Sequence, residues 1–152
     1  MTTPLSLVLA LALSLALPAS ADTRPASAFA EALQRGADQA ASCQVQIEHD
    51  ADELPGCVQA RARTDTGTPP RLAQAHRLGA LFRGWVMADT AAAYAVDGAE
   101  PAAAALLLEL LPLQRKLGVS DAALCKLMAD GCRGLIERKH EVERSKAFRQ
   151  GR

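Results

Sequence analysis

The sequence predicts an all-α protein: an antiparallel up-down bundle of four to five helices, stapled by disulfides. Three observations support this fold class. Apolar residues recur at intervals of three or four along most of the chain, which is typical of helices with a buried face. Ala and Leu dominate, whereas the 152 residues include only three Phe, one Tyr and one Trp, and this favours close-packed helices over sheets. The four cysteines follow an apparent export signal, and cysteines of exported proteins normally form disulfides.

Residues 1–21 are typical of a secretory signal peptide. Leu5–Leu17 is a run of thirteen residues that are all Leu, Val, Ala or Ser, and about 20 are needed to cross a bilayer. The small residues of Ala19-Ser20-Ala21 predict cleavage after Ala21. The segment departs from the usual pattern in having no Lys or Arg before the apolar run. We therefore expect 22–152 to form a single helical domain in the periplasm, without a membrane anchor after cleavage.

The first predicted helix runs from a cap at Ser27 to Leu54. Its apolar or small residues keep a helical spacing over nearly four heptads; they are Phe29, Leu33, Gly36, Ala40, Cys43, Ile47, Ala51 and Leu54. Pro55-Gly56 is expected to end this helix. Residues 61–70 are polar and rich in turn-forming types, so they predict a loop.

The second helix is predicted from Pro69 to Val96, because Thr68 offers a cap and proline is tolerated in a first helical turn. Its apolar residues lie on more than one face, so we expect neighbours on two sides. Trp85, the single tryptophan, shares the face of Leu78 and Leu81 and is expected in the core. Asp97-Gly98 ends the helix.

The third helix begins at Pro101 and is apolar nearly all round, which predicts a place at the centre of the bundle. Pro112 cannot donate a backbone hydrogen bond, so a kink or break is expected there. Gly118 ends this segment. Ser120-Asp121 caps the last helix, whose pattern fades so that a solvated, frayed end is expected at about 140–152. The predicted buried residues of this last helix are Leu124, Cys125, Met128, Cys132, Leu135 and Ile136.

The four cysteines allow three pairings. Cys125 and Cys132 lie seven apart on one predicted helix, so their Cα atoms would be about 10 Å apart, beyond the roughly 7 Å that a disulfide spans. Cys43 and Cys57 would be farther apart still along a continuous first helix. An up-down bundle places Cys57 level with Cys125 and Cys43 level with Cys132. The crossed pairing Cys57–Cys125 and Cys43–Cys132 is therefore the prediction.

The local pairing remains the alternative. A Cys43–Cys57 bridge requires the first helix to turn near Asp50, and a Cys125–Cys132 bridge requires Gly131 to break the last helix. Another interpretation is a Cu(I) site on one helix face from Cys125, Met128 and Cys132, which an oxidising compartment disfavours.

An acidic segment is the candidate partner-binding surface. Its residues are Glu48, His49, Asp50, Asp52 and Glu53. The ordinary interpretation of such a segment is the solvated end of the first helix. Carboxylates at the C-terminal end of a helix face the unfavourable end of the helix dipole, and this mismatch adds weight to a partner-facing role. The Thr64–Pro70 loop is expected to share this contact surface.

Other polar residues carry weaker expectations. Glu109 interrupts the apolar third helix, so it either reaches water or marks a buried pocket with a raised carboxyl pKa. His49, His76 and His140 fall on three different elements, and nothing in the sequence brings them together. Haem bound by a histidine and Met87 or Met128 is conceivable in a bundle.

The sequence holds no catalytic motif: neither Cys-x-x-Cys, Gly-x-Ser-x-Gly, His-Glu-x-x-His nor a phosphate-binding glycine loop occurs. The 17 basic and 17 acidic residues balance, which argues against a nucleic-acid partner held by bulk charge. The sequence therefore predicts a non-enzymatic periplasmic protein-binding module, such as an inhibitor, an immunity protein or an accessory subunit, without a cofactor. The alternative is a bundle that binds a small ligand such as a lipid, a metal or haem. The sequence does not indicate the oligomeric state or the identity of the partner.

Overall fold

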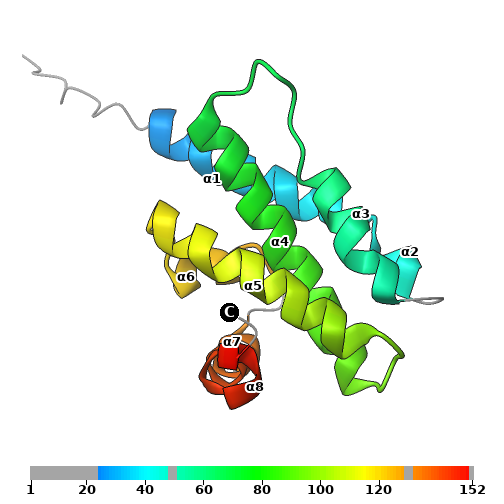
Figure 1. Cartoon of the computed structure of the whole chain (residues 1–152). Coiled ribbons are helices and arrows are strands. Elements are labelled where there is room, and N and C mark those ends of the chain that lie inside the picture. The colour runs from blue at the N-terminus through cyan, green and yellow to red at the C-terminus, as the bar shows by residue number, and fades with distance from the viewer. Residues whose placement is uncertain (1–23, 48–50, 129–131, 151–152) are drawn as a thin grey trace, which may run out of the picture.

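The computed structural model describes residues 24–47, 51–128 and 132–150, and within these ranges every regular element is helical (Figure 1). The elements are α1 (Arg24–Ala41), α2 (Gln44–Ile47), the 3-10 turn η1 (Ala51–Glu53), α3 (Leu54–Arg61), α4 (Pro70–Ala93), α5 (Ala99–Leu117), α6 (Asp121–Cys125), α7 (Arg133–Arg144) and α8 (Lys146–Gln150). The prediction of an all-α, disulfide-stapled bundle is confirmed. Of the helices described, none combines the length and the apolar character needed to cross a bilayer.

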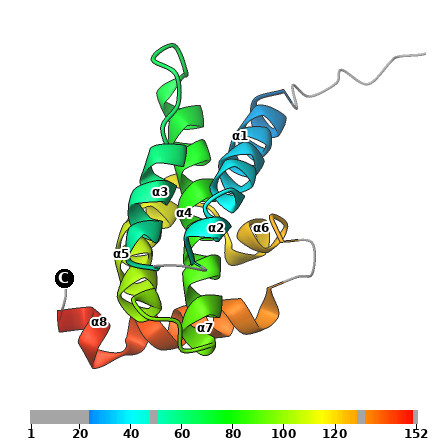
Figure 2. The same ribbon diagram turned by 90° about the vertical axis from the view of Figure 1, so that its right-hand side faces the viewer.

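Helix α4 is the centre of the bundle, and α1, α3 and α5 pack around it (Figures 1 and 2). Thirteen of its residues are buried, because neighbours cover it on more than one side, as the sequence predicts. Trp85 is fully buried. Helix α5 runs antiparallel to α4, so that Arg77 near the start of α4 meets Glu109 in the second half of α5.

Two glycines allow α1 and α4 to approach closely. A Cβ atom on Gly36 would overlap the backbone carbonyl of His76, and one on Gly79 would overlap the carbonyl of Leu33. Each glycine thus faces the backbone of the opposite helix, and only hydrogen fits in the space between them. The sequence pattern identified Gly36 as a buried position but did not reveal this reciprocal contact.

The first predicted helix is interrupted. Helix α1 ends at Ala41, where the Ser42 hydroxyl donates to the carbonyl of Gln39 and the amide of Cys43 donates to the carbonyl of Ala40. These tight turns redirect the chain, and α3 begins at Leu54, where the prediction had the first helix end. Pro55-Gly56 therefore lies in the first turn of a helix rather than after one, a position that proline tolerates because no amide hydrogen is needed there.

Helix α5 continues through Pro112 to Leu117, so the expected break is absent. Pro112 is exposed, and its ring therefore needs no room in the core. Gly118 ends the helix as predicted, in the left-handed conformation with φ of 65°. Ser120 caps α6 as predicted, since its hydroxyl accepts a hydrogen bond from the amide of Ala123 at 3.2 Å.

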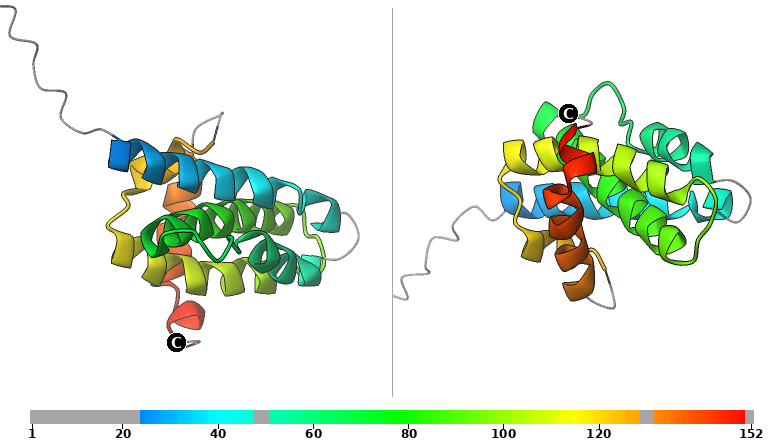
Figure 3. Two further views of the ribbon diagram at one scale, coloured as in Figure 1. Left: turned by 90° about the horizontal axis from the view of Figure 1, so that it is seen from above. Right: turned by 60° about the horizontal axis from the view of Figure 1, so that its bottom comes forward.

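The last predicted helix is divided into α6 and α7, and α7 crosses one side of α4 and α5 instead of running along them (Figures 2 and 3). Cys125 ends α6 and Cys132 precedes α7. Beyond α7, the chain is helical to Gln150, and Phe148 is 6% exposed within the core.

The predicted crossed pairing of the cysteines is wrong. The disulfides are Cys43–Cys57 and Cys125–Cys132, with Cα atoms 5.9 and 5.2 Å apart. The prediction assumed a continuous helix across each pair, which would hold the sulfur atoms too far apart. Because the chain leaves the helix between the two cysteines of each pair, both bridges are local.

Candidate functional site

An apolar groove lies along one face of α4, and we call it the α4 groove. Its cavity volume is about 450 Å³, within the range of small-ligand sites. The α4 side supplies a stripe, Arg83, Val86, Met87, Thr90 and Ala91, whose members recur at intervals of three or four residues and so share one face of the helix. The groove is lined by Gln44, Ile47, Arg83, Val86, Met87, Thr90, Ala91, Tyr94, Val96 and Met128.

Two disulfide-closed segments supply the sides of the α4 groove. Gln44 and Ile47 belong to the segment that Cys43–Cys57 closes. Met128 belongs to the segment that Cys125–Cys132 closes. Each bridge ties the two ends of its segment together and so restricts the conformations open to that segment. The disulfides, predicted here as crosslinks between the first and last helices, instead hold the two flanks of one groove.

Of the described residues that line the α4 groove, Arg83 is the one that carries a charge. Its Nη1 donates to the Met128 sulfur at 3.5 Å, which is a weak acceptor. Its Nε is buried and has no hydrogen-bond partner. Among the ion pairs of the described residues, none involves Arg83. A partly buried guanidinium is thus left with one thioether contact, although each of its N–H groups can donate.

Two apolar side chains stand exposed beside the α4 groove. Tyr94, at the end of the groove opposite Arg83, is 81% exposed. Val45, next to the groove-lining Gln44 in α2, is 63% exposed. Exposed apolar groups next to a groove are typical of a surface that meets a ligand or partner.

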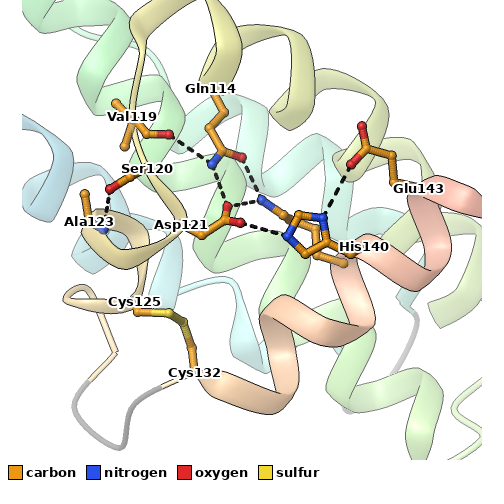
Figure 4. Close-up of polar contacts among 10 residues, drawn as sticks. Gln114, Val119, Ser120, Asp121, Ala123, Cys125, Cys132, His140 and Glu143 are labelled. Carbon is orange, nitrogen blue, oxygen red and sulfur yellow. Dashed lines mark hydrogen bonds and ion pairs between the residues drawn. A yellow bond between two sulfur atoms is a disulfide. The ribbon is translucent and has the colours of Figure 1, made fainter.

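A second polar cluster joins α5, α6 and α7 (Figure 4). The ammonium of Lys139 is buried, and it donates to Gln114 Oε1 at 2.9 Å and to Asp121 Oδ1. Gln114 Nε2 donates to the same Asp121 oxygen at 2.8 Å, and His140 Nε2 lies 2.9 Å from Asp121 Oδ2.

The electrostatics of this cluster favour the ionised form of Asp121. Partial burial raises the pKa of its carboxyl, but hydrogen bonds from Lys139 and Gln114 and the Lys139 charge outweigh that effect, so the pKa lies below its usual range. The lysine has two oxygen acceptors and the aspartate has donors on both oxygens. The cluster therefore links α7 to α5 and α6.

The structure describes only part of the predicted acidic surface. Asp52 and Glu53 are exposed in η1, whereas Glu48, His49 and Asp50 lie outside the described residues. The Thr64–Pro70 loop follows α3, and η1 precedes it, so the length of α3 separates the two. The structure thus does not bring this loop to the same contact surface as Asp52 and Glu53.

The other singled-out polar residues have structural partners. His76 is buried, with Nδ1 3.3 Å from the Ala62 carbonyl and Nε2 3.0 Å from Gln39 Oε1. Glu109 accepts from Arg77 and from Gln59, each at 2.7 Å. Within the described part of the chain, no three metal-binding side chains form a group that could hold a metal ion. Cys125 and Cys132 are bonded to each other, so their sulfurs are not the thiolates that the copper interpretation needs.

Sequence reasoning missed the α4 groove. The spacing of Arg83, Met87 and Thr90 was available, but a helix expected to be covered on two sides leaves no sign of which stripe stays open. An arginine among apolar residues of that stripe was the one signal that could have indicated a site. Comparisons with known protein families, curated proteins and solved structures find no match to this chain.

Proposed function

We propose that this chain is a non-catalytic binding protein of the cell envelope that holds the apolar part of its ligand in the α4 groove. One observation carries the proposal: an apolar recess runs along the central helix, lined in part by Val86, Met87 and Ala91, which are 5–7% exposed, and two disulfide-closed segments flank it. A rigid apolar recess requires little ordering on binding, so most of the gain from burying ligand surface is kept as affinity.

The compartment is part of the proposal. Two disulfides within one small chain suit an oxidising environment, and residues 1–21 have the pattern of an export signal. In the bacterial periplasm, a binding site held by disulfides would keep its shape.

A protein partner is the second candidate, and the exposed side chains of Tyr94 and Val45 favour it. Tyrosine is enriched among the residues that dominate protein interfaces, and an apolar groove can take one face of a partner helix. In that case the groove would receive the partner's apolar side chains, and Asp52 and Glu53 would be candidates for its margin.

The groove can be tested with the neutral fluorescent probe N-phenyl-1-naphthylamine and the oxidised mature chain. Thr90→Phe places a ring inside the groove from an exposed position of α4. Ala105→Phe is the matched control, since Ala105 is exposed on α5 and does not line the groove. We expect Thr90→Phe to weaken probe binding about tenfold, or about 1.4 kcal/mol, and Ala105→Phe to leave it unchanged.

Absence of probe binding to the wild type, or equal binding by the two phenylalanine variants, would overturn the groove as a ligand site. Both variants should keep the helical circular dichroism of the wild type. A stoichiometric envelope protein captured by the wild type and lost in Tyr94→Ala would favour the protein partner over a small ligand.

A further inference from the structure

The α4 groove combines a long apolar surface with a cation at one end. Arg83 and Tyr94 lie eleven residues apart, so the stripe between them extends for roughly 16 Å at the helical rise of 1.5 Å per residue. Val86, Met87 and Ala91 occupy that stripe. A ligand that fills the groove therefore meets apolar surface over its length and a positive charge at the Arg83 end.

The hydrogen bonding of Arg83 shows that its end of the α4 groove lacks an acceptor for the guanidinium. A guanidinium is planar and has five donors in a fork that matches a carboxylate. Here one donor reaches a thioether, and the buried Nε has no partner. Leaving a buried donor of a charged group without an acceptor is costly, so the negative charge of an anion beside the guanidinium would stabilise it. Thr90 offers no competing donor, because its hydroxyl already donates to the Val86 carbonyl at 2.8 Å.

We infer that the ligand of the α4 groove is a single-chain aliphatic carboxylate whose head binds the Arg83 guanidinium and whose tail extends along α4 toward Tyr94. This inference rests on the proposed function and adds the chemical class of its ligand. The cavity of about 450 Å³ suits one such chain. The carboxylate would accept charge-assisted hydrogen bonds from the fork, and these are stronger than neutral ones.

The test compares dodecanoate with dodecanol, which shares the tail but has no charge, as competitors of N-phenyl-1-naphthylamine at a pH where the fatty acid is ionised. We expect dodecanoate to bind the wild type about tenfold more tightly than dodecanol. Arg83→Gln should remove that preference by weakening dodecanoate alone, and Arg83→Lys should restore part of it. Arg35→Gln is the matched control, because Arg35 is an exposed arginine of α1 that pairs with Glu31.

The outcomes separate this inference from the proposed function. Equal binding of dodecanoate and dodecanol that Arg83→Gln leaves unchanged would overturn the role of Arg83 and keep the groove as an apolar site. Failure of both compounds to displace a bound probe would overturn the fatty-acid class. Failure of the probe itself to bind would overturn the groove and this inference together. An equal loss of dodecanoate affinity in Arg35→Gln would show that bulk charge, and not the Arg83 position, determines the preference.

Discussion

Helices α1 and α7 are attached to the rest of the bundle by different means. Helix α1 packs on α4 through backbone contact, with Gly36 and Gly79 each facing the opposite helix. Helix α7 crosses the bundle, and besides the packing of its apolar residues on the core it is held by long polar side chains, among them Lys139 on Asp121 and Gln114 (Figure 4). Arg138 adds an ion pair with Asp89 of α4 at 3.3 Å.

The two attachments should differ in their response to changes of side-chain size, pH and salt. Contact between backbones depends on shape, so it resists changes of pH and salt but fails when one methyl group is added. Contact through a buried ion pair depends less on the size of the surrounding side chains and more on whether both members of the pair are ionised. We therefore expect the N-terminal attachment to respond to side-chain size and the C-terminal attachment to respond to pH.

The largest expected effect comes from adding one methyl group between α1 and α4. Gly79→Ala would place a Cβ against the carbonyl of Leu33, and backbone on both sides leaves no flexible group to move away. We expect a loss of about 3 kcal/mol in the free energy of unfolding, measured by urea denaturation.

Gly56→Ala is the matched control for that substitution. Gly56 lies in α3, and a Cβ there would meet nothing within 4 Å. Its replacement should stabilise the protein by about 0.5–1 kcal/mol, because alanine favours the helix. If Gly79→Ala were also neutral or stabilising, the close contact of α1 and α4 would be wrong.

The disulfides separate global from local stability. Cys43–Cys57 joins residues 14 apart and Cys125–Cys132 joins residues 7 apart, so loop-closure entropy gives about 3 and about 2.5 kcal/mol respectively. Replacing each pair by serine should therefore cost similar amounts of global stability. Amide hydrogen exchange should differ, with faster exchange over α7 when Cys125 and Cys132 are replaced, and little change over α1 when Cys43 and Cys57 are replaced.

Peptide mapping under non-reducing conditions checks the disulfide pairing on which this prediction depends. The oxidised chain should yield Cys43 linked to Cys57 and Cys125 linked to Cys132. Crossed peptides would restore the pairing that the continuous-helix interpretation predicts. Faster exchange over α1 in the first serine pair would contradict the idea that the glycine contact alone holds that helix.

The helices were predictable where local signals and burial agree. Ser120 caps a helix and Gly118 ends one because a hydroxyl acceptor and a left-handed φ are local requirements. The breaks after Ala41 and Cys125 were not predictable from periodicity, because the apolar spacing continues across them. Which cysteines pair depends on those breaks, so one error in the helix ends led to the wrong pairing.

The α4 groove was harder to predict from the sequence than the helices were. The α4 groove exists because two segments flank one stripe of α4 and leave a recess between them, and this is a property of the tertiary arrangement. The burial of Lys139 was equally unpredictable from the sequence. This residue lies in a charged segment that predicts a solvated helix end, but its side chain is 2% exposed. Its burial depends on Gln114 and Asp121, which come from two other helices.

The pH response of the C-terminal attachment follows from Asp121. Because the folded protein lowers the pKa of this carboxyl below its ordinary value of 3.8, the ionised form stabilises the fold. That contribution is fully present above the ordinary pKa and is lost as the pH falls through the lower pKa of the folded state. Asp121→Asn should cost about 2 kcal/mol at neutral pH, less than for a fully buried pair because the carboxyl is partly exposed.

Chemical denaturation at a series of pH values measures this contribution. The difference in unfolding free energy between the wild type and Asp121→Asn should narrow steadily as the pH falls below about 4, because the unfolded chain then takes up the Asp121 proton before the folded protein does. Below the pKa of the folded state, both proteins present a neutral group to Lys139. Asp38→Asn is the control, since Asp38 is an exposed carboxylate that accepts a hydrogen bond from Gln34 on the same helix; it should change stability by less than about 0.5 kcal/mol at neutral pH. A difference for Asp121→Asn that stays constant with pH would mean that the aspartate acts through shape, and the contrast between the two attachments would then fail.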